Sequence, residues 1–246
     1  MGDRGIDFTY GAACCEKRFG RIEEHSSEFH LRIITMARIT NEAVEAYMYQ
    51  LLRPRDAVLA EMEAEARKHR IPIVGPAVGQ FFYQLALLNK ASRIFEMGSA
   101  IGYSTIWWAR AIKPGGKVYY SDGDPENAAK ADEYLKRAGV RDRVEILVGN
   151  SLDLIDQVDG DFDIIFNDVD KHYYPEVHRK VAGRVRVGGL LVTDNTLWSG
   201  KVADLSVKDS DTEGVRESNK MLYADDRYCP VLIPLRDGVA VGLRVK

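Results

Sequence analysis

The chain has 246 residues, of which 46% are hydrophobic and 29% are charged. This balance is typical of a soluble globular domain with a substantial core, and it excludes a disulfide-stapled miniprotein and a disordered chain. The 34 basic and 37 acidic residues give a net charge of −3, so the chain as a whole has no charge excess that would attract nucleic acid or an anionic membrane.

The cysteines and apolar runs indicate where the protein works. Cys14, Cys15 and Cys229 match neither a disulfide framework nor a spaced metal motif, which favours a reducing compartment. The most apolar run, Val78 to Leu88, contains two glutamines and is shorter than the roughly 18 residues that a membrane span needs. The first residues lack the apolar core of a secretory signal. We therefore expect a cytoplasmic protein that does not enter the membrane.

Regular structure is expected to begin near residue 40. Residues 1–35 show neither helical nor strand periodicity, and we interpret them as a poorly ordered extension that precedes one domain over 36–246. After Thr40 or Asn41, either of which can cap a helix, apolar residues recur at three- and four-residue intervals. This spacing predicts three successive helices, at about 41–52, 55–69 and 78–89.

From Arg93 onward, short β-branched and aromatic runs alternate with helical segments, which is typical of βαβ units and a parallel sheet. Strands are predicted at 93–97, 117–121, 144–148, 162–167 and 190–193, and helices at 104–112, 126–138 and 175–185. Gly188 and Gly189 are expected to close the last of these helices. Asp237-Gly238 is a strong hairpin signal between runs at 228–234 and 239–245. The expected fold class is α/β, with a mostly parallel sheet, N-terminal helices and a C-terminal antiparallel hairpin.

A turn with two glycines follows the first predicted strand, at Glu96-Met97-Gly98-Ser99-Ala100-Ile101-Gly102. Nucleotide-like ligands bind at this end of an open α/β sheet, but the run lacks the middle glycine of the dinucleotide fingerprint and a phosphate-binding Gly-Lys pair. Glu96 would attract a cation such as a sulfonium, and Asp122, after the second strand, can accept hydrogen bonds from ribose hydroxyls. The pattern favours S-adenosylmethionine, while a plain βα turn remains the alternative.

Oxygen-bearing side chains follow two further strands. Asp168 comes after the fourth predicted strand, and Asp194 and Asn195 follow the fifth. Adjacent parallel strands lie about 4.8 Å apart, so these oxygens can converge on one hard cation, Mg²⁺, Mn²⁺ or Ca²⁺, rather than on zinc. Lys171 would reach the same pocket as a base or else be an exposed loop lysine, and His172 is interpreted as a surface or supporting residue.

Three runs carry a resemblance that covers residue 38 to the end: Glu96-Met97-Gly98-Ser99-Ala100-Ile101-Gly102-Tyr103-Ser104, Asp168-Val169-Asp170-Lys171-His172-Tyr173-Tyr174, and Gly188-Gly189-Leu190-Leu191-Val192-Thr193-Asp194-Asn195-Thr196-Leu197-Trp198-Ser199-Gly200. With Ile71-Pro72-Ile73-Val74-Gly75-Pro76 and Pro234-Leu235-Arg236-Asp237-Gly238, they resemble the cation-dependent O-methyltransferases of the caffeoyl-CoA and catechol type, in particular the small bacterial and archaeal members.

The resemblance implies a class I methyltransferase fold, Rossmann-like with seven strands, in a homodimer that uses S-adenosylmethionine and a divalent cation, commonly Mg²⁺. The residues at the family's cofactor positions are Glu96, Gly98, Ser99, Ser104, Asp122, Asn150, Ser151 and Asp168. Those at its metal positions are Asp168, Asp194 and Asn195. Lys171 matches the proposed catalytic base, acting beside Asp168, and Trp198 lies in the acceptor loop. Asn167, where the family usually has an apolar residue, and Asn150, where it often has Asp, depart from the pattern.

The chemistry expected is methyl transfer to one of two neighbouring hydroxyls of a small catechol-like aromatic, with the cation lowering the hydroxyl pKa. A hydroxylated uridine in tRNA is the alternative acceptor, for which Arg53, Arg55, Lys68, His69 and Arg70 would form a local basic face. Two rivals from other classes are a nicotinamide-dependent oxidoreductase and a non-catalytic S-adenosylmethionine-binding protein.

Overall fold

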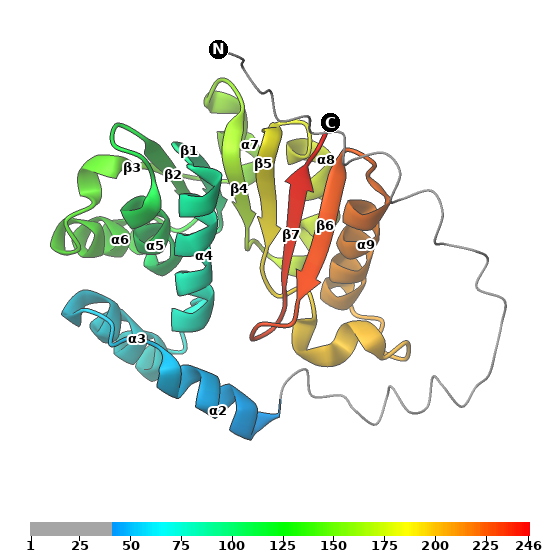
Figure 1. The fold of residues 1–246 in the computed structure, drawn as a ribbon, viewed down its shortest axis with the longest axis horizontal. Helices are drawn as coiled ribbons and strands as arrows, with labels where there is room; N and C mark the ends of the chain where they lie inside the picture. The colour runs from blue at the N-terminus through cyan, green and yellow to red at the C-terminus, as the bar shows by residue number, and fades with distance from the viewer. Residues whose placement is uncertain (1–40) are drawn as a thin grey trace, which may run out of the picture. The chain divides into compact units, whose positions relative to one another are not determined.

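The computed structural model describes residues 41–246, which form a seven-stranded sheet in the order β3-β2-β1-β4-β5-β7-β6, with helices on both faces (Figure 1). The first five strands in this order, β3, β2, β1, β4 and β5, pair in parallel with their neighbours. Strand β7 pairs antiparallel with both β5 and β6. The expected α/β sheet with a C-terminal antiparallel hairpin is therefore confirmed. Residues 1–35, interpreted above as an extension, lie outside the described part of the chain.

The strands are β1 (Arg93–Met97), β2 (Lys117–Asp122), β3 (Val144–Val148), β4 (Phe162–Asn167), β5 (Val185–Thr193), β6 (Tyr228–Ile233) and β7 (Val239–Arg244). The helices are α2 (Glu42–Leu51), α3 (Ala57–His69), α4 (Gly75–Asn89), α5 (Tyr103–Ala111), α6 (Pro125–Arg137), α7 (Ser151–Leu154), α8 (Tyr174–Val181) and α9 (Ser210–Ala224). Short 3-10 helices include η3 (Lys171–Tyr173) and η4 (Trp198–Ala203).

Side-chain oxygens determine where the first helices begin. The Asn41 side chain accepts a hydrogen bond from the Ala43 backbone at 2.8 Å, which places the first residue of α2 at Glu42. The second predicted helix begins two residues later than expected, because Asp56 caps it by accepting from the backbone N–H groups of Val58 and Leu59.

Alternate residues of the strands supply two separate cores, as the two-residue period of a strand requires. On one face, Ile94 of β1 packs in a core with residues of α3, α4, α5 and α6, where the rings of Phe82 and Trp108 stack 4.4 Å apart. On the other face, Phe95 packs in a core with residues of α7, α8 and α9. No helix in the described residues is both long and apolar enough to cross a membrane.

The structure corrects two expectations about the C-terminal half. Helix α8 ends at Val181 and β5 already begins at Val185, so Gly188 and Gly189 lie inside a strand instead of closing a helix. The pairing of β4 with β5 shifts register here, and a Cβ on Gly189 would lie 2.7 Å from the Asp163 carbonyl oxygen. Helix α9, which no pattern above predicted, covers this end of the sheet.

Candidate functional site

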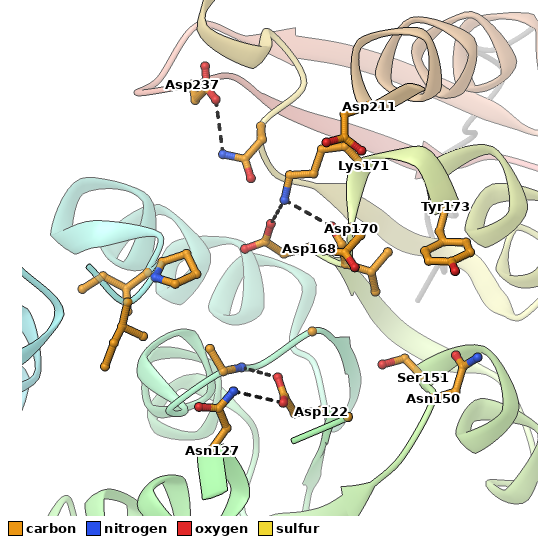
Figure 2. Close-up of a pocket in the computed structure, with 18 of the residues that line it drawn as sticks. Asp122, Asn127, Asn150, Ser151, Asp168, Asp170, Lys171, Tyr173, Asp211 and Asp237 are labelled. Atoms are coloured by element: carbon orange, nitrogen blue, oxygen red, sulfur yellow. Dashed lines mark hydrogen bonds and ion pairs between the residues drawn. The ribbon is translucent and has the colours of Figure 1, made fainter. Parts of the chain in front are cut away.

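A cavity of about 930 Å³ lies where β1, β4 and β5 end (Figure 2). The register aligns Met97 with Asn167, and Asn167 with Thr193, so the residues that follow these strands meet at one edge. Of the residues expected at the site from the sequence, those that line this cavity are Gly98, Asp122, Asn150, Ser151, Asp168, Lys171, Asn195 and Trp198. The sheet thus brings together residues more than 90 positions apart in the chain.

Gly98 allows the ends of β1 and β4 to approach each other. Its φ is +80°, and a Cβ at this position would lie 2.6 Å from the carbonyl oxygen of Asp168. The backbone N–H of Asp168 in turn donates to the Met97 carbonyl at 2.9 Å. Glycine is therefore required here for the position of Asp168 as well as for access of a ligand to the backbone.

Asp122 and the start of α7 form the far wall of the cavity. The Asp122 carboxylate accepts from the Ala100 backbone N–H at 2.9 Å and from the Asn127 amide at 3.2 Å (Figure 2). Asn150 caps α7 by accepting from Leu152 N–H at 3.0 Å, and Ser151 follows it. Asp122 is thereby held in a fixed orientation in the wall, where its carboxylate can accept hydrogen bonds from a bound hydroxylated ligand.

Glu96, Ser99 and Ser104 lie behind the cavity wall and are not among the residues that line it. The Glu96 carboxylate is fully buried and accepts a hydrogen bond from the Thr105 hydroxyl, whereas its Oε1 has no hydrogen-bond partner among residues 41–246. Burial raises the pKa of Glu96 to about 7. The predicted contact of Glu96, Ser99 and Ser104 with the cofactor stays a prediction.

The residues predicted as oxygen ligands follow neighbouring strand ends, Asp168 after β4 and Asp194 and Asn195 after β5. Asp194 is completely buried, and its Oδ1 has no hydrogen-bond partner in the described residues, whereas Oδ2 lies 3.3 Å from the Arg236 guanidinium. Asp168 is bonded to the Lys171 ammonium at 2.8 Å (Figure 2). Asn195, held at a φ of +56°, donates through its amide nitrogen to Asp237 at 3.4 Å.

Electrostatics make this carboxylate pair a fitting site for a cation. Burial raises the pKa of both Asp168 and Asp194, and the negative charge of Asp168 raises that of Asp194 further. Residues 41–246 contain no group of three or more His, Cys, Asp or Glu side chains placed to hold a metal ion. A cation beside Asp168 and Asp194 would therefore need a further oxygen, such as that of the Asn195 amide. Such a set suits Mg²⁺, which keeps several of its waters.

Lys171 is positioned by helix α9. Its ammonium lies between Asp168 and two aromatic rings, 5.4 Å from the Tyr174 ring centre and 5.7 Å from that of Trp198. Gly214 of α9 packs directly on this segment, where a Cβ would lie 2.8 Å from His172 Cα. His172 itself is half-exposed and pairs with Asp211 at 3.1 Å, outside the carboxylate pair.

A residue that the sequence did not single out, Arg216, holds the loop that contains Trp198. Its nearly buried guanidinium donates to the carbonyls of Lys201, Val202, Asp204 and Val207, which follow or form η4. On the other side, the N–H groups of Thr196 and Leu197 donate to the carbonyls of Gly238 and Asp237, at 3.0 and 2.9 Å. The loop that contains Trp198 is thus held between α9 and the hairpin of β6 and β7.

Asn167, the departure from the family pattern, faces away from the carboxylate pair. It lies with His178 and Thr193 around a separate cavity of about 10 Å³ on the side of α8 and α9, and its Oδ1 has no hydrogen-bond partner in the described residues. A cavity of this size holds about one water molecule.

Comparison with known proteins agrees with this geometry. The chain matches the O-methyltransferase family (Methyltransf_3) over residues 52–245. It is 37% identical over 213 residues to the catechol O-methyltransferase of Niastella koreensis, covering 82% of this chain and 96% of that protein. It is 30% identical over 235 residues to caffeoyl-CoA O-methyltransferase 1 of Eucalyptus globulus, covering 90% and 94% of the two chains.

Solved structures give the same result. An O-methyltransferase from Bacillus cereus in complex with SAH superposes with a TM-score of 0.75 at 30% identity, over 82% of this chain and 97% of that one. TomG from Streptomyces achromogenes in complex with SAM superposes with a TM-score of 0.76 at 31% identity, over 83% and 96%. Family and fold agree: the chain belongs to the O-methyltransferase family and is an S-adenosylmethionine-dependent O-methyltransferase with a class I methyltransferase fold.

Proposed function

We propose that this enzyme methylates one of two neighbouring hydroxyls on a small aromatic acceptor, with a divalent cation, preferably Mg²⁺, held by Asp168, Asp194 and Asn195. The observation that supports the proposal is the buried Asp194 Oδ1, which has no hydrogen-bond partner in the described residues, beside Asp168 and Asn195, which line the same cavity as Asp122. The relatives named for catechol and caffeoyl-CoA support an acceptor of this kind.

Different residues around the cavity would bind S-adenosylmethionine and the acceptor. Asp122 would accept hydrogen bonds from the ribose hydroxyls of S-adenosylmethionine, with Asn150 and Ser151 beside the adenine and the backbone at Gly98 close to the methionine part. When bound, the cation supplies Lewis acidity that lowers the pKa of the acceptor hydroxyls. Placing both reactants in one cavity can contribute about 7–11 kcal/mol to the barrier reduction.

Lys171 is the proposed proton acceptor. Its Nζ lies 2.8 Å from Asp168 Oδ1 and lines the cavity. As a neutral amine Lys171 would take the proton that the attacking hydroxyl releases, and as an ammonium it would stabilise the oxyanion that is left. The hydroxyl oxygen then forms a bond to the methyl carbon as the bond from that carbon to sulfur breaks. The Trp198 ring beside Lys171 would confine the aromatic acceptor.

The test is methyl transfer from labelled S-adenosylmethionine to a panel of catechols, with Mg²⁺ and with a chelator. Transfer should require the cation, and Asp168→Asn should abolish it. Asp170→Asn, which removes a neighbouring exposed carboxylate outside the ligand set, should retain it. Undiminished transfer in chelator, or by Asp168→Asn, would refute the proposed metal site. No transfer to any acceptor would favour a binding protein without catalysis.

Bulk tRNA belongs in the same panel as the alternative acceptor. Of the basic residues expected to face RNA, Arg55 is paired with Glu63 at 2.9 Å, whereas Arg53, Lys68, His69 and Arg70 are exposed. Because the exposed set is small and the chain carries a net charge of −3, we propose a small-molecule acceptor. Salt-sensitive methylation of tRNA would overturn that choice.

We also propose that the enzyme is a homodimer. Helix α2 buries none of its residues within the described chain, and Val44, Tyr47, Met48 and Leu51 all expose apolar surface. Light scattering coupled to size-exclusion chromatography should give twice the 27.7 kDa mass of the chain. A monomer at micromolar concentration would contradict the proposal.

A further inference from the structure

A second cavity, which we call the annex, adjoins the cavity described above. It has a volume of about 360 Å³ and is lined by side chains that include Tyr49, Arg55, Glu63, Arg67 and Arg236. Ile71, Pro72, Ile73 and Arg236 line both cavities, so the annex adjoins the cavity that Asp168 and Lys171 line. No residue role assigned above uses this space.

The annex has an excess of positive charge. Glu63, the carboxylate among its described lining residues, is buried and fully engaged: it accepts from Arg55 Nε and Nη2 at 2.9 and 3.0 Å and from the Tyr103 hydroxyl at 2.8 Å. Arg55 and Glu63 therefore neutralise each other. Arg67 makes no ion pair with any described residue. Arg236 is paired with Asp194 at 3.3 Å on the other side, so both guanidinium groups line the annex without a carboxylate partner from within it.

Arg236 lies at the junction of the two cavities. It occupies the hairpin between β6 and β7 with a φ of +53°, in the left-handed region where glycine or asparagine is the usual residue. Its guanidinium, one-third exposed, reaches Asp194 at 3.3 Å. A backbone conformation that disfavours arginine thus places a cation beside the site where methylation is proposed, which points to a role for its side chain.

The two cavities differ in the charge they would accept. Asp122, Asp168, Asp170, Asp211 and Asp237 line the larger one, so an anionic substituent on the acceptor would be repelled there. In the annex the same substituent would meet two guanidinium groups and the Tyr49 hydroxyl. Burial raises the pKa of Tyr49, so this hydroxyl stays protonated and can donate a hydrogen bond. Charge alone would therefore orient an anionic acceptor.

We propose that Arg236 and Arg67 bind a carboxylate of the acceptor, so that the preferred substrate is an aromatic acid with two neighbouring ring hydroxyls and a carboxylate-bearing side chain. The inference rests on the proposed function for the position of the hydroxyls. The carboxylate would enter the annex past Pro72, while the ring remains at the cavity that Lys171 and Trp198 line.

The experiment compares three acceptors that share a 3,4-dihydroxyphenyl ring: the free propenoic acid, its uncharged methyl ester and its coenzyme A thioester. The wild-type enzyme should use the acid best. In Arg236→Gln and Arg67→Gln, the ratio of kcat/KM for acid to that for ester should fall at least about tenfold, the effect expected from losing one charge-assisted hydrogen bond. Lys68→Gln removes a neighbouring charge of α3 that lines neither cavity, and it should leave the ratio unchanged.

The affinities of the enzyme for the acid and for the ester, measured by calorimetry with SAH bound, test the inference independently of methyl transfer. Arg67 is exposed, so its substitution should leave the fold intact and weaken binding of the acid selectively. Equal use of acid and ester by the wild type, or an acid preference that survives Arg67→Gln, would overturn the proposal. A preference for the thioester would also overturn it, since phosphates would then be the bound group. Absence of transfer with selective acid binding would refute only the proposed function.

Discussion

Replacing Glu96 by glutamine should change how the stability of the ligand-free enzyme depends on pH. Glu96 is fully buried behind the glycine turn, and burial is the main reason that its pKa is raised from 4.5 to about 7. A folded-state pKa above the unfolded one means that the native state favours the neutral carboxyl. Its contribution to stability is complete below about pH 4.5 and is lost as the pH rises through about 7.

The difference between the two pKa values gives the magnitude. One pKa unit corresponds to about 1.4 kcal/mol, so ionisation of Glu96 in the folded state costs about 3 kcal/mol. A glutamine has the shape of the neutral carboxyl and no charge to lose. The free energy of unfolding of wild type relative to Glu96→Gln should therefore decrease by about 3 kcal/mol between pH 4.5 and pH 8.

Urea unfolding of both proteins at several pH values, without metal or cofactor, measures this difference. Asp168 and Asp194 also titrate, but they are present in both proteins and their effects largely cancel. Glu61→Gln is the control: it is exposed, and its hydrogen bond to Arg137 lowers its pKa, so its contribution changes only at more acidic pH. Parallel stability curves for wild type and Glu96→Gln from pH 5 to 8 would refute the account of Glu96.

Three further substitutions test the packing around the site. Gly98→Ala places a methyl group 2.6 Å from the Asp168 carbonyl oxygen at a φ of +80°, and it should cost about 2–5 kcal/mol in the free energy of unfolding, measured in urea. A cost below about 1 kcal/mol would contradict the close approach of β1 and β4. Gly214→Ala pushes α9 away from the Lys171 segment and should lower kcat more than it raises the KM for the acceptor; an unchanged kcat would show that this contact does not position Lys171. Arg216→Lys leaves carbonyls of the loop that contains Trp198 without donors, and it should lower the free energy of unfolding by about 1–3 kcal/mol in thermal unfolding experiments. It should also raise the KM for the acceptor. An unchanged KM would show that this loop does not bind the acceptor.

Strand periodicity was a reliable guide to the residues at the sheet edge. The run Phe162–Asn167 is buried along its whole length, and its apolar Phe162, Ile164, Ile165 and Phe166 are typical of a strand in a parallel sheet. Asp168 could therefore be placed at a strand end from the sequence. The same reasoning placed Asp194 beside it. Parallel pairing with a common register then brings the two carboxylates together, as the spacing predicts.

The features that the sequence did not reveal depend on contacts between distant segments. Helix α9 buries small and polar residues such as Thr212, Gly214 and Ser218, which make no apolar stripe, although Asp209 as a cap was a usable signal. Gly189 is a residue type that commonly follows a helix, but it lies in β5, where the pairing with β4 shifts register. Arg216 is a charged residue in a polar segment, and only the folded loop shows that carbonyls surround it.

Direct titration of the enzyme with Mn²⁺, followed by electron paramagnetic resonance or calorimetry, tests the central claim that Asp168, Asp194 and Asn195 hold a catalytic cation. The wild type should bind Mn²⁺, with Mg²⁺ competing for the site. Asp194→Asn should weaken binding by about a hundredfold or more, since losing a mere supporting group typically costs roughly 10–100-fold. Asp170→Asn should bind as the wild type does. Absence of Mn²⁺ binding, or equal binding by wild type and Asp194→Asn, would contradict the account.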